Sequence, residues 1–565
     1  MSATKLISAY ILLLLVSVFF QRTHAVGNAI LEVVSDSGQP STDKYCIQYN
    51  DQYQQLPKTL ENASPLNLKD LSDIEGCDLS EYRGHQISSH HTLVAVMRGN
   101  CSFTLKALIA EAASARAVLV VDYANSSLTP LPGGNKTEYG ALNITLAVIS
   151  WHDYQTIIHS GGQVRVSLYA PSRPRWDANM MFIIFASTLL VMFGGVWAAY
   201  SEEQAWKQRS KVRASSIDTE ESEEEGLPFT VCGVLIWFAF ICTTILLLYF
   251  FYDYMVYVFI ALFCIVGAHS LYRCLLPLWT RIMPINYDIP LNRLPCFKSK
   301  ANLGSLILLM PCLTLGIFWA VERHASYAWV LQDILGACFC VYLIQNLRLP
   351  SLKIISILLV MLLLYDVFFV FITPLLTSDG ESVMVSVATG GKGGSKESLP
   401  MVFLIPLFGD SPLYMCRERS YSLLGFGDVI IPGLLVAYNA VCDVRLRRGG
   451  IHNGRTLYFI VAVAGYLIGM VLCMVSLMLM ESGQPALLYL VPCTLIPTVA
   501  MALCRKELGL LYRGHSRISA DSQDTVESQV GAGHVQEGRA EEEEDEDENG
   551  IRANEHLEEQ MNLIS

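Results

Sequence analysis

Nine long runs of apolar residues fill the second part of this chain, and they restrict it to folds that cross a lipid bilayer. We place the runs near 180–200, 228–251, 255–275, 302–321, 328–346, 352–376, 421–441, 456–480 and 485–504. Each is long enough for a helix to cross roughly 30 Å of hydrocarbon. Because 52% of the 565 residues are apolar and only 16% are charged, a polytopic membrane protein fits better than a soluble enzyme. The sequence therefore predicts a multi-pass α-helical membrane domain over 180–504.

The N-terminus has the pattern of a secretory signal over residues 1–25. Lys5 precedes the apolar run Leu6 to Phe20, and Thr23-His24-Ala25 places a small residue at the expected cleavage point. An uncleaved first membrane anchor is the alternative, and either one sends residues 26–179 into the lumen. The N-x-Ser/Thr sequons support this location, since all of them precede the first long apolar run. We expect glycosylation at Asn62, Asn100, Asn125, Asn135 and Asn143, with Asn100 the weakest candidate because Cys101 follows it.

Residues 26–179 alternate short β-like runs with polar turns, which predicts an α/β luminal domain. The segments 92–103 (TLVAVMRGNCSF) and 115–123 (ARAVLVVDY) have the composition of strands, and TLKALIAEAASA between them is typical of a helix. In an oxidising lumen, Cys46, Cys77 and Cys101 suggest one disulfide and an odd residue left over. Cys416, in a later luminal loop, is available as the partner of the odd cysteine. The sequence does not decide the pairing.

Basic residues test the topology, because the cytosolic loops of membrane proteins are enriched in Lys and Arg. With the N-terminus in the lumen, nine spans place the C-terminus in the cytosol. The predicted cytosolic loops then hold most of the basic residues, among them Lys207, Arg348, Arg445 and Arg505, whereas the short luminal turns hold few. Arg323, on the luminal side, is an exception. The distribution is consistent with the nine-span topology.

The segment 505–565 is polar and acidic, and we expect it to be a disordered cytosolic tail. Runs of acids at 220–225 and 541–548 contribute much of the net charge of −13, so the acidic balance gives no support for nucleic-acid binding. The chain ends EEQMNLIS, in which Glu559, Leu563 and Ile564 match an acidic-dileucine signal that a sorting adaptor reads. That signal favours an endosomal or lysosomal membrane.

Two acids stand inside predicted spans, where an ionisable group is costly and indicates function. Asp366 lies in the sixth run, LLLYDVFFVFITP, and Asp428 lies in the seventh, YSLLGFGDVIIPGLLVAY. If both runs are helical at 1.5 Å per residue, the two carboxyls lie at a similar depth, roughly 12–16 Å below the luminal surface. Gly425 and Gly427 allow another helix, or an extended substrate backbone, to come close to Asp428.

A third element, Pro485-Ala486-Leu487, lies in the luminal turn that opens the ninth run, on the same side of the membrane as both acids. Paired carboxylates do not easily both ionise, so one can act as a base on water while the other, protonated, polarises a carbonyl. This is aspartic-protease chemistry, which needs no cofactor or metal, and we find no metal-ligand spacing in the sequence. The alternatives are a proton-coupled transporter, which also uses intramembrane acids, and a non-catalytic receptor or scaffold.

Together these motifs resemble those of the GxGD intramembrane aspartyl proteases. The resemblance rests on Tyr365-Asp366 in the sixth run, Gly425-Phe426-Gly427-Asp428 in the seventh, and Pro485-Ala486-Leu487 at the ninth. The ectodomain resembles a protease-associated domain, mainly through 98–103 (RGNCSF). Within the class, the chain is most similar to the signal peptide peptidase-like 2 subfamily, in its A or B members.

The resemblance implies a presenilin-like nine-helix fold and cleavage of type II membrane proteins within their spanning segment, usually after their ectodomain has been shed. It assigns Asp366 and Asp428 as the catalytic dyad. It assigns the shape of the site and substrate binding to Tyr365, Gly425, Phe426, Gly427, Pro485, Ala486 and Leu487. The expected partners are type II substrates and their shed stubs within the lipid bilayer, and a homo-oligomer stays open. The resemblance also implies a late endosomal, lysosomal, Golgi or plasma membrane location.

Overall fold

The computed structural model describes residues 27–513 with interruptions. The interruptions are 36–40, 52, 84, 86, 88–90, 125–131, 134–135, 160–163, 172–177, 216–230, 284–302, 377–381, 385–386, 388–396, 408–411, 417–420, 449–455 and 481–483. The predicted signal segment, the sequons Asn125 and Asn135, and the sorting residues Glu559, Leu563 and Ile564 lie outside the described residues. The chain forms two compact units, which are described separately below.

The first unit contains a closed β-barrel with the strand order β1-β2-β6-β5-β4-β3-β7. The elements are β1 (Gly27–Ser35), β2 (Ser41–Tyr49), β3 (Leu66–Leu71), β4 (Thr92–Met97), α2 (Phe103–Ala112), β5 (Ala117–Val121), α3 (Lys136–Gly140), β6 (Thr145–Ile149), α4 (Trp151–His159) and β7 (Val164–Tyr169). Strands β3 to β6 pair in parallel, and α2 connects β4 to β5. The predicted α/β ectodomain is confirmed, but the first predicted strand is too long. It ends at Met97, and Ser102 begins the helix by accepting a hydrogen bond from the Leu105 N–H.

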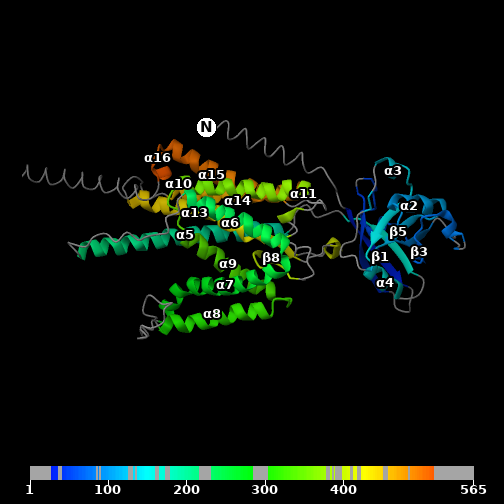
Figure 1. Cartoon of the computed structure of the whole chain (residues 1–565), viewed down its shortest axis with the longest axis horizontal. Helices are drawn as coiled ribbons and strands as arrows, with labels where there is room; N and C mark the ends of the chain where they lie inside the picture. Colours follow the sequence, from blue (N-terminus) through cyan, green and yellow to red (C-terminus); the bar gives the residue numbers. More distant parts are fainter. Residues whose placement is uncertain are drawn as a thin grey trace, which may run out of the picture. The chain divides into compact units, whose positions relative to one another are not determined.

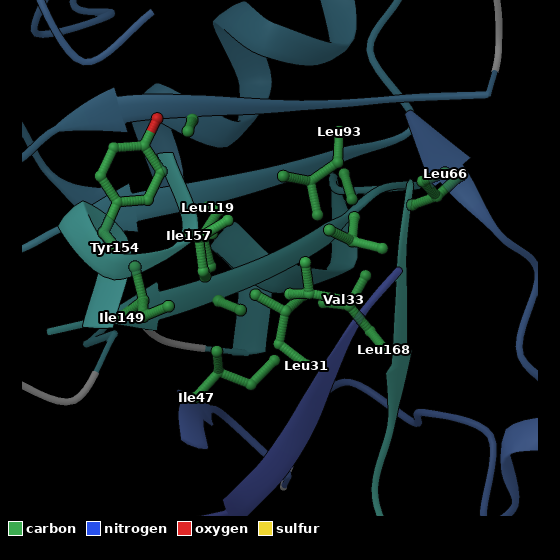
Figure 2. Close-up of a cluster of buried hydrophobic side chains, with 14 of the residues drawn as sticks. Leu31, Val33, Ile47, Leu66, Leu93, Leu119, Ile149, Tyr154, Ile157 and Leu168 are labelled. Carbon is green, nitrogen blue, oxygen red and sulfur yellow. The ribbon is translucent and has the colours of Figure 1, made fainter. Parts of the chain in front are cut away.

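Alternate residues of the strands fill two apolar cores on opposite faces of the sheet, as the twofold repeat of a strand requires. Figure 2 shows the inner core, in which Leu31, Leu93 and Leu119 meet Tyr154 from α4. The residues between them, such as Val94 and Val118, pack on the other face together with α2. Buried Tyr154 donates its hydroxyl hydrogen bond to Asp70 Oδ1 at 2.5 Å, so its polar end is satisfied.

Two disulfides resolve the pairing that the sequence leaves open. Cys77 is bonded to Cys101, and Cys46 is bonded to Cys416, which lies 370 residues further along the chain. Cys416, one partner that the sequence leaves available, is therefore the partner of Cys46. Cys101 is the middle residue of the Asn100 sequon. Its disulfide to Cys77 is the reason for which Asn100 is expected to be the weakest glycosylation site.

The second unit contains the helices of membrane-spanning length. Among the described residues, nine helices are long and apolar enough to cross a bilayer, which confirms the multi-pass helical prediction. They are α5 (Ala178–Ser215), α6 (Val231–Phe250), α7 (Tyr252–Ile282), α8 (Leu303–Val321), α9 (Ala328–Asn346), α10 (Leu352–Val367) with its extension, α13 (Phe426–Arg448), α14 (Leu457–Met480) and α15 (Leu487–Cys504). The extension of α10 consists of the π-helix η3 (Phe368–Ile372) and α11 (Thr373–Leu376), and α16 (Leu508–Arg513) follows α15. Figure 1 shows α7 and α8 running side by side.

The seventh span begins later than the sequence predicts. Residues 421–425 do not belong to the helix but form β9 (Tyr421–Gly425), which pairs with β8 (Val402–Pro406). The N–H of Phe426 then donates to the Met401 carbonyl at 3.1 Å, where the helix starts. Glycine has a low helix propensity, and Gly425 and Gly427 flank this start. The helix that was assumed from Ser420 onward is therefore wrong, because Asp428 stands in the first turn of α13. The similar depth of the two acids, which was estimated from that helix, stays a prediction.

Small residues allow the helices around α13 to pack closely. Of the nine spans, α13 is the most completely buried. A Cβ on Gly433 would lie 2.7 Å from Ile344 Cδ1 of α9, and a Cβ on Gly469 of α14 would lie 3.1 Å from the Tyr489 carbonyl oxygen of α15. A Cβ on Gly465 would overlap the Cys493 carbonyl oxygen. Backbones can approach this closely only where no side chain stands between them.

Arg323, the basic residue that the topology places on the luminal side, is paired. Its guanidinium donates from Nη2 to Glu397 Oε1 at 2.7 Å and from Nε to Oε2 at 3.0 Å. The Tyr252 hydroxyl donates to the Glu397 carbonyl at 3.0 Å. These bonds connect the ends of α7 and α8 to the segment that leads into β8.

We expect Glu397→Gln to destabilise the protein by about 1–2 kcal/mol at neutral pH, the value of a partly exposed charge-assisted pair. The hydrogen bonds from Arg323 hold the pKa of Glu397 below its usual value, although burial acts in the opposite direction. A lowered folded-state pKa gives stability above the unfolded pKa, about 4.3, that is lost as the pH falls through the folded value. The stability difference between wild type and Glu397→Gln should therefore persist from pH 7 to pH 5 and shrink below about pH 4.

Thermal unfolding of the detergent-solubilised protein at several pH values measures this difference. Glu322→Gln is a suitable control, because the Glu322 side chain accepts a long, 3.4 Å hydrogen bond from exposed Tyr327, and its substitution should change stability little. A difference between wild type and Glu397→Gln that disappears between pH 7 and pH 5 would contradict the role of the pair.

Candidate functional site

Asp366 lies one residue before the end of α10, with only 4% of its surface exposed. The helix begins at Ser351, whose hydroxyl accepts a hydrogen bond from the Ile354 N–H, and its buried face consists of leucine and isoleucine. Two residues further on the helix widens into the π-helix η3, a feature that often occurs at functional sites. The Ser382 and Thr373 hydroxyls donate to the Phe369 carbonyl within this segment. Asp366 is therefore held at the end of a regular helix inside an apolar bundle.

Asp428 lies close to Asp366, although 62 positions separate them in the sequence. Its carboxyl is partly buried, and its charge acts on Asp366. The Tyr466 hydroxyl of α14 donates to the Asp428 backbone carbonyl at 3.4 Å. A Cβ on Gly425 would lie 3.3 Å from Asp428 Oδ2, so the glycine leaves room for the carboxylate to rest against the backbone. Gly427 is exposed.

Pro485 and Ala486 directly precede α15, Leu487 is its first residue, and this segment lies beside Asp366. The Pro485 carbonyl accepts a hydrogen bond from the Leu488 N–H, and the Ala486 carbonyl accepts one from Tyr489. The first N–H groups of a helix have no partner within the helix. The Leu487 N–H donates instead to Asp366 Oδ2 at 3.0 Å. The predicted third element therefore contacts one of the two acids directly, through its backbone.

Phe426 and Tyr365 pack against neighbouring rings. Phe426 is 3% exposed, and its ring lies among Phe263, Phe339 and Phe403, against the backbone of Gly336. Its contacts are those of an anchor for the start of α13. The ring of half-buried Tyr365 lies 4.7 Å from that of Phe369 and 6.3 Å from that of Phe238 on α6. Both residues therefore shape the site through aromatic packing.

Sequence reasoning missed several residues that surround the two acids. Tyr466 and Cys473 of α14 both lie near them, and the charges of Asp366 and Asp428 both act on Cys473. Tyr489 and Ser476 share a 2.6 Å hydrogen bond beside the start of α15. A tyrosine, serine or cysteine in an apolar run carries no signal by itself, because it is uncharged and its neighbours are set by helix packing.

The sequons that fall on described residues, Asn62, Asn100 and Asn143, have exposed side chains. Asn143 Nδ2 donates to Glu111 Oε1 at 2.8 Å, and Asn62 Nδ2 donates to Thr59.

Among the residues that the structure describes, no group of three or more His, Cys, Asp or Glu side chains could hold a metal ion. The site thus offers two neighbouring carboxyls and a backbone N–H. Such a pair can share one proton and activate water against a carbonyl.

Comparison with known proteins gives the family. A family profile described as signal peptide peptidase matches residues 220–517, and a PA domain profile matches 64–157. The chain is 39% identical to mouse signal peptide peptidase-like 2B over 86% of this chain and 82% of that protein. It is 39% identical to human signal peptide peptidase-like 2A over 90% and 93% of the two chains, and 35% identical to human signal peptide peptidase-like 2C over 88% and 75%.

Among solved structures, the zinc aminopeptidase BSAP from Bacillus subtilis covers 29% of this chain and 38% of its own at 15% identity and a TM-score of 0.19, which is too low to carry an argument. The match to the signal peptide peptidase profile covers more than half of the chain and includes both acids. Together with the identity to the peptidase-like 2 proteins over most of their length, it shows that this chain belongs to the signal peptide peptidase family and is an intramembrane aspartic protease with an N-terminal PA domain.

Proposed function

We propose that Asp366 and Asp428 are the catalytic dyad, and that the enzyme cuts type II membrane proteins within their spanning segment, preferably after their ectodomains have been shed. The observation that carries the assignment is the hydrogen bond from the Leu487 N–H to buried Asp366, beside Asp428. It joins the three sequence motifs in one place. Transporters and receptors also tolerate a buried acid, but family membership favours the protease.

The proposed reaction uses one ionised and one protonated carboxyl. The ionised carboxylate takes a proton from water as the water oxygen attacks the scissile carbonyl carbon, and the protonated carboxyl donates to the carbonyl oxygen. The C–N bond of the tetrahedral intermediate then breaks: the nitrogen takes up the proton that the first carboxylate accepted, and a hydroxyl of the intermediate returns a proton to the second carboxylate, which restores the starting pair. The chain supplies the two carboxyls and the backbone donor that orients Asp366.

A helical substrate must unwind before it is cut, because its carbonyls are hydrogen-bonded within the helix. Gly425 and Gly427 carry no side chains, so an extended backbone can come close to Asp428. Strand β9 leads directly into Asp428 through Gly425. These features favour an extended substrate conformation at the site.

Preference for type II proteins follows from the proposed orientation, with the ectodomain in the lumen and the tail in the cytosol. We test this with two pre-shed, epitope-tagged stubs that share one spanning sequence, one in type II and one in type I orientation. Wild type should release a cytosolic fragment from the type II stub, and Asp428→Asn should cause that stub to accumulate. Equal cleavage of both stubs would contradict the preference, whereas cleavage of neither would point to other substrates.

The remaining assignments are also proposals. We keep the division into a signal over 1–25, an ectodomain over 26–179, a membrane domain over 180–504 and a cytosolic tail over 505–565. The acidic-dileucine match supports an adaptor-dependent late endosomal or lysosomal location, with passage through the Golgi and plasma membrane. Microscopy of the tagged protein against compartment markers tests this location, and digestion with a glycosidase tests use of the sequons.

A further inference from the structure

Three polar side chains form a hydrogen-bonded ring beside the start of α15. Ser476 of α14 and Tyr489 of α15 lie 2.6 Å apart between their hydroxyl oxygens. The Gln484 side-chain oxygen lies 3.4 Å from Ser476 Oγ and 3.3 Å from Tyr489 Oη. Ser476 is 8% exposed and Tyr489 is 5% exposed. The two hydroxyls are thus enclosed, where water does not readily replace a lost hydrogen bond, whereas Gln484 is half-buried.

The three side chains have two hydroxyl protons to donate, and these can form only two alternative chains of hydrogen bonds. Each of the two hydroxyls donates one proton, and the Gln484 carbonyl oxygen only accepts. If Ser476 donates to Tyr489, then Tyr489 donates to Gln484; if Tyr489 donates to Ser476, then Ser476 donates to Gln484. In both arrangements the short hydroxyl pair and the amide oxygen are satisfied together. Loss of either hydroxyl therefore removes the short hydroxyl pair and leaves a single long hydrogen bond to the Gln484 side chain.

The ring encloses the segment that contacts the dyad. Gln484 directly precedes Pro485, and Tyr489 follows Leu487 by two residues, so both ends of the segment are tied to Ser476 on α14. Between the ties, the Leu487 N–H donates to Asp366. The close approach of α14 and α15 at Gly469 lies beside Tyr489 and Leu490, so the ring acts on a rigid contact between helices.

We propose that Ser476, Gln484 and Tyr489 are positioning residues that fix the Leu487 N–H on Asp366. The proposal rests on the assignment of Asp366 to the dyad made above. The three side chains act on Asp366 through the backbone of Leu487. Their loss should lower kcat much more than it changes KM, because it misaligns the reacting carboxyl, and none of the three side chains is itself assigned a substrate contact.

The experiment compares Tyr489→Phe, Ser476→Ala and the double variant with wild type, using a purified enzyme and a tagged type II stub. We expect each single change to lower kcat about tenfold, the effect of losing a buried hydrogen bond. Because either single change already removes the shared hydroxyl pair, the double variant should lose clearly less than the hundredfold expected of independent sites. Ser476→Thr, which keeps the hydroxyl, should restore most of the activity.

Tyr438→Phe is the matched control. Tyr438 is also buried and donates a 2.8 Å hydrogen bond, to the Leu511 carbonyl. It lies ten residues beyond Asp428 on α13, which is roughly 15 Å along the helix. Its loss should lower thermal stability to a similar extent while leaving kcat within about twofold of wild type.

Several outcomes would overturn the proposal: a kcat for Tyr489→Phe no lower than for Tyr438→Phe, a multiplicative loss in the double variant, or a raised KM with kcat unchanged. If Tyr489→Phe does not accumulate as folded protein, the comparison of Ser476→Ala with Ser476→Thr decides the question. Asp366→Asn separates this proposal from the assignment on which it rests. Activity in Asp366→Asn would disprove the assignment of the dyad. An inactive Asp366→Asn together with normal activity in Tyr489→Phe would disprove only the positioning role of Ser476, Gln484 and Tyr489.

Discussion

Asp366→Asn and Asp428→Asn are each expected to lower kcat about a thousandfold or more, since each removes one partner of the acid–base pair. Asparagine has nearly the size of aspartate, and its oxygen can still accept the Leu487 hydrogen bond, so the fold should remain. The double variant should be no less active than either single variant, because the two carboxyls act as one unit. Release of the cytosolic fragment from a type II stub measures the effect.

Asp443→Asn provides the control for a buried acid on the same helix. Asp443 is 3% exposed, and it accepts hydrogen bonds from the N–H groups of Tyr458 and Phe459 at the start of α14. Its substitution should destabilise the protein by about 1–2 kcal/mol, as loss of a helix cap does, but leave cleavage within a few fold of wild type. Cleavage near the wild-type rate by Asp366→Asn or Asp428→Asn would disprove the dyad.

The second large effect is expected from Gly465→Ala, a change of one methyl group. Alanine is the better helix former by about 1 kcal/mol, so helix propensity alone predicts stabilisation. The added Cβ would instead overlap the Cys493 carbonyl oxygen of α15 and lie 3.0 Å from the Cys493 carbonyl carbon. Both are backbone atoms, so α14 and α15 must separate. We expect a loss of about 1–3 kcal/mol of stability.

Activity should fall more steeply than stability. The first turn of α15 carries the Leu487 N–H that contacts Asp366, and a displacement of about 1 Å at a reacting group can reduce the rate roughly a hundredfold. Gly509→Ala in α16 is the control, since its Cβ would meet no atom within 4 Å. Thermal unfolding and fragment release together test the prediction. Stabilisation without loss of activity would show that α15 does not have to lie this close to α14.

The parts of the site that the sequence predicts are those with a high free-energy penalty in a membrane. Asp366 and Asp428 stand out because a carboxyl inside a membrane span has a high free-energy cost, which indicates a functional role. Pro485-Ala486-Leu487 stands out only beside them, since the motif is short. By contrast, burying Ser476 or Tyr489 in a membrane span has a low free-energy cost, so neither residue stands out in the sequence. They become significant only because α14 and α15 bring their hydroxyls together.

The start of the seventh span shows where apolar composition fails. An apolar run of spanning length gives the approximate position of a span, and each of the nine predicted runs overlaps one of the nine spanning helices found among the described residues. Composition does not distinguish a strand that enters such a run from the first turns of its helix. Here Tyr421 to Gly425 form β9 because β8, from a different part of the chain, pairs with them. That pairing depends on tertiary contacts that a local pattern does not contain.

The bond between Cys46 and Cys416 has a consequence for topology. A covalent bond between two side chains cannot cross a bilayer, so residues 46 and 416 must face the same compartment. Among the described residues, six candidate spans, α5 to α10, lie between them, and an even number of crossings returns the chain to the side from which it started. The three spans that follow, α13 to α15, then place Arg513 on the opposite side. Because disulfides persist in oxidising compartments, the spans counted among the described residues agree with the proposed luminal ectodomain and cytosolic tail, and they do so independently of the distribution of basic residues.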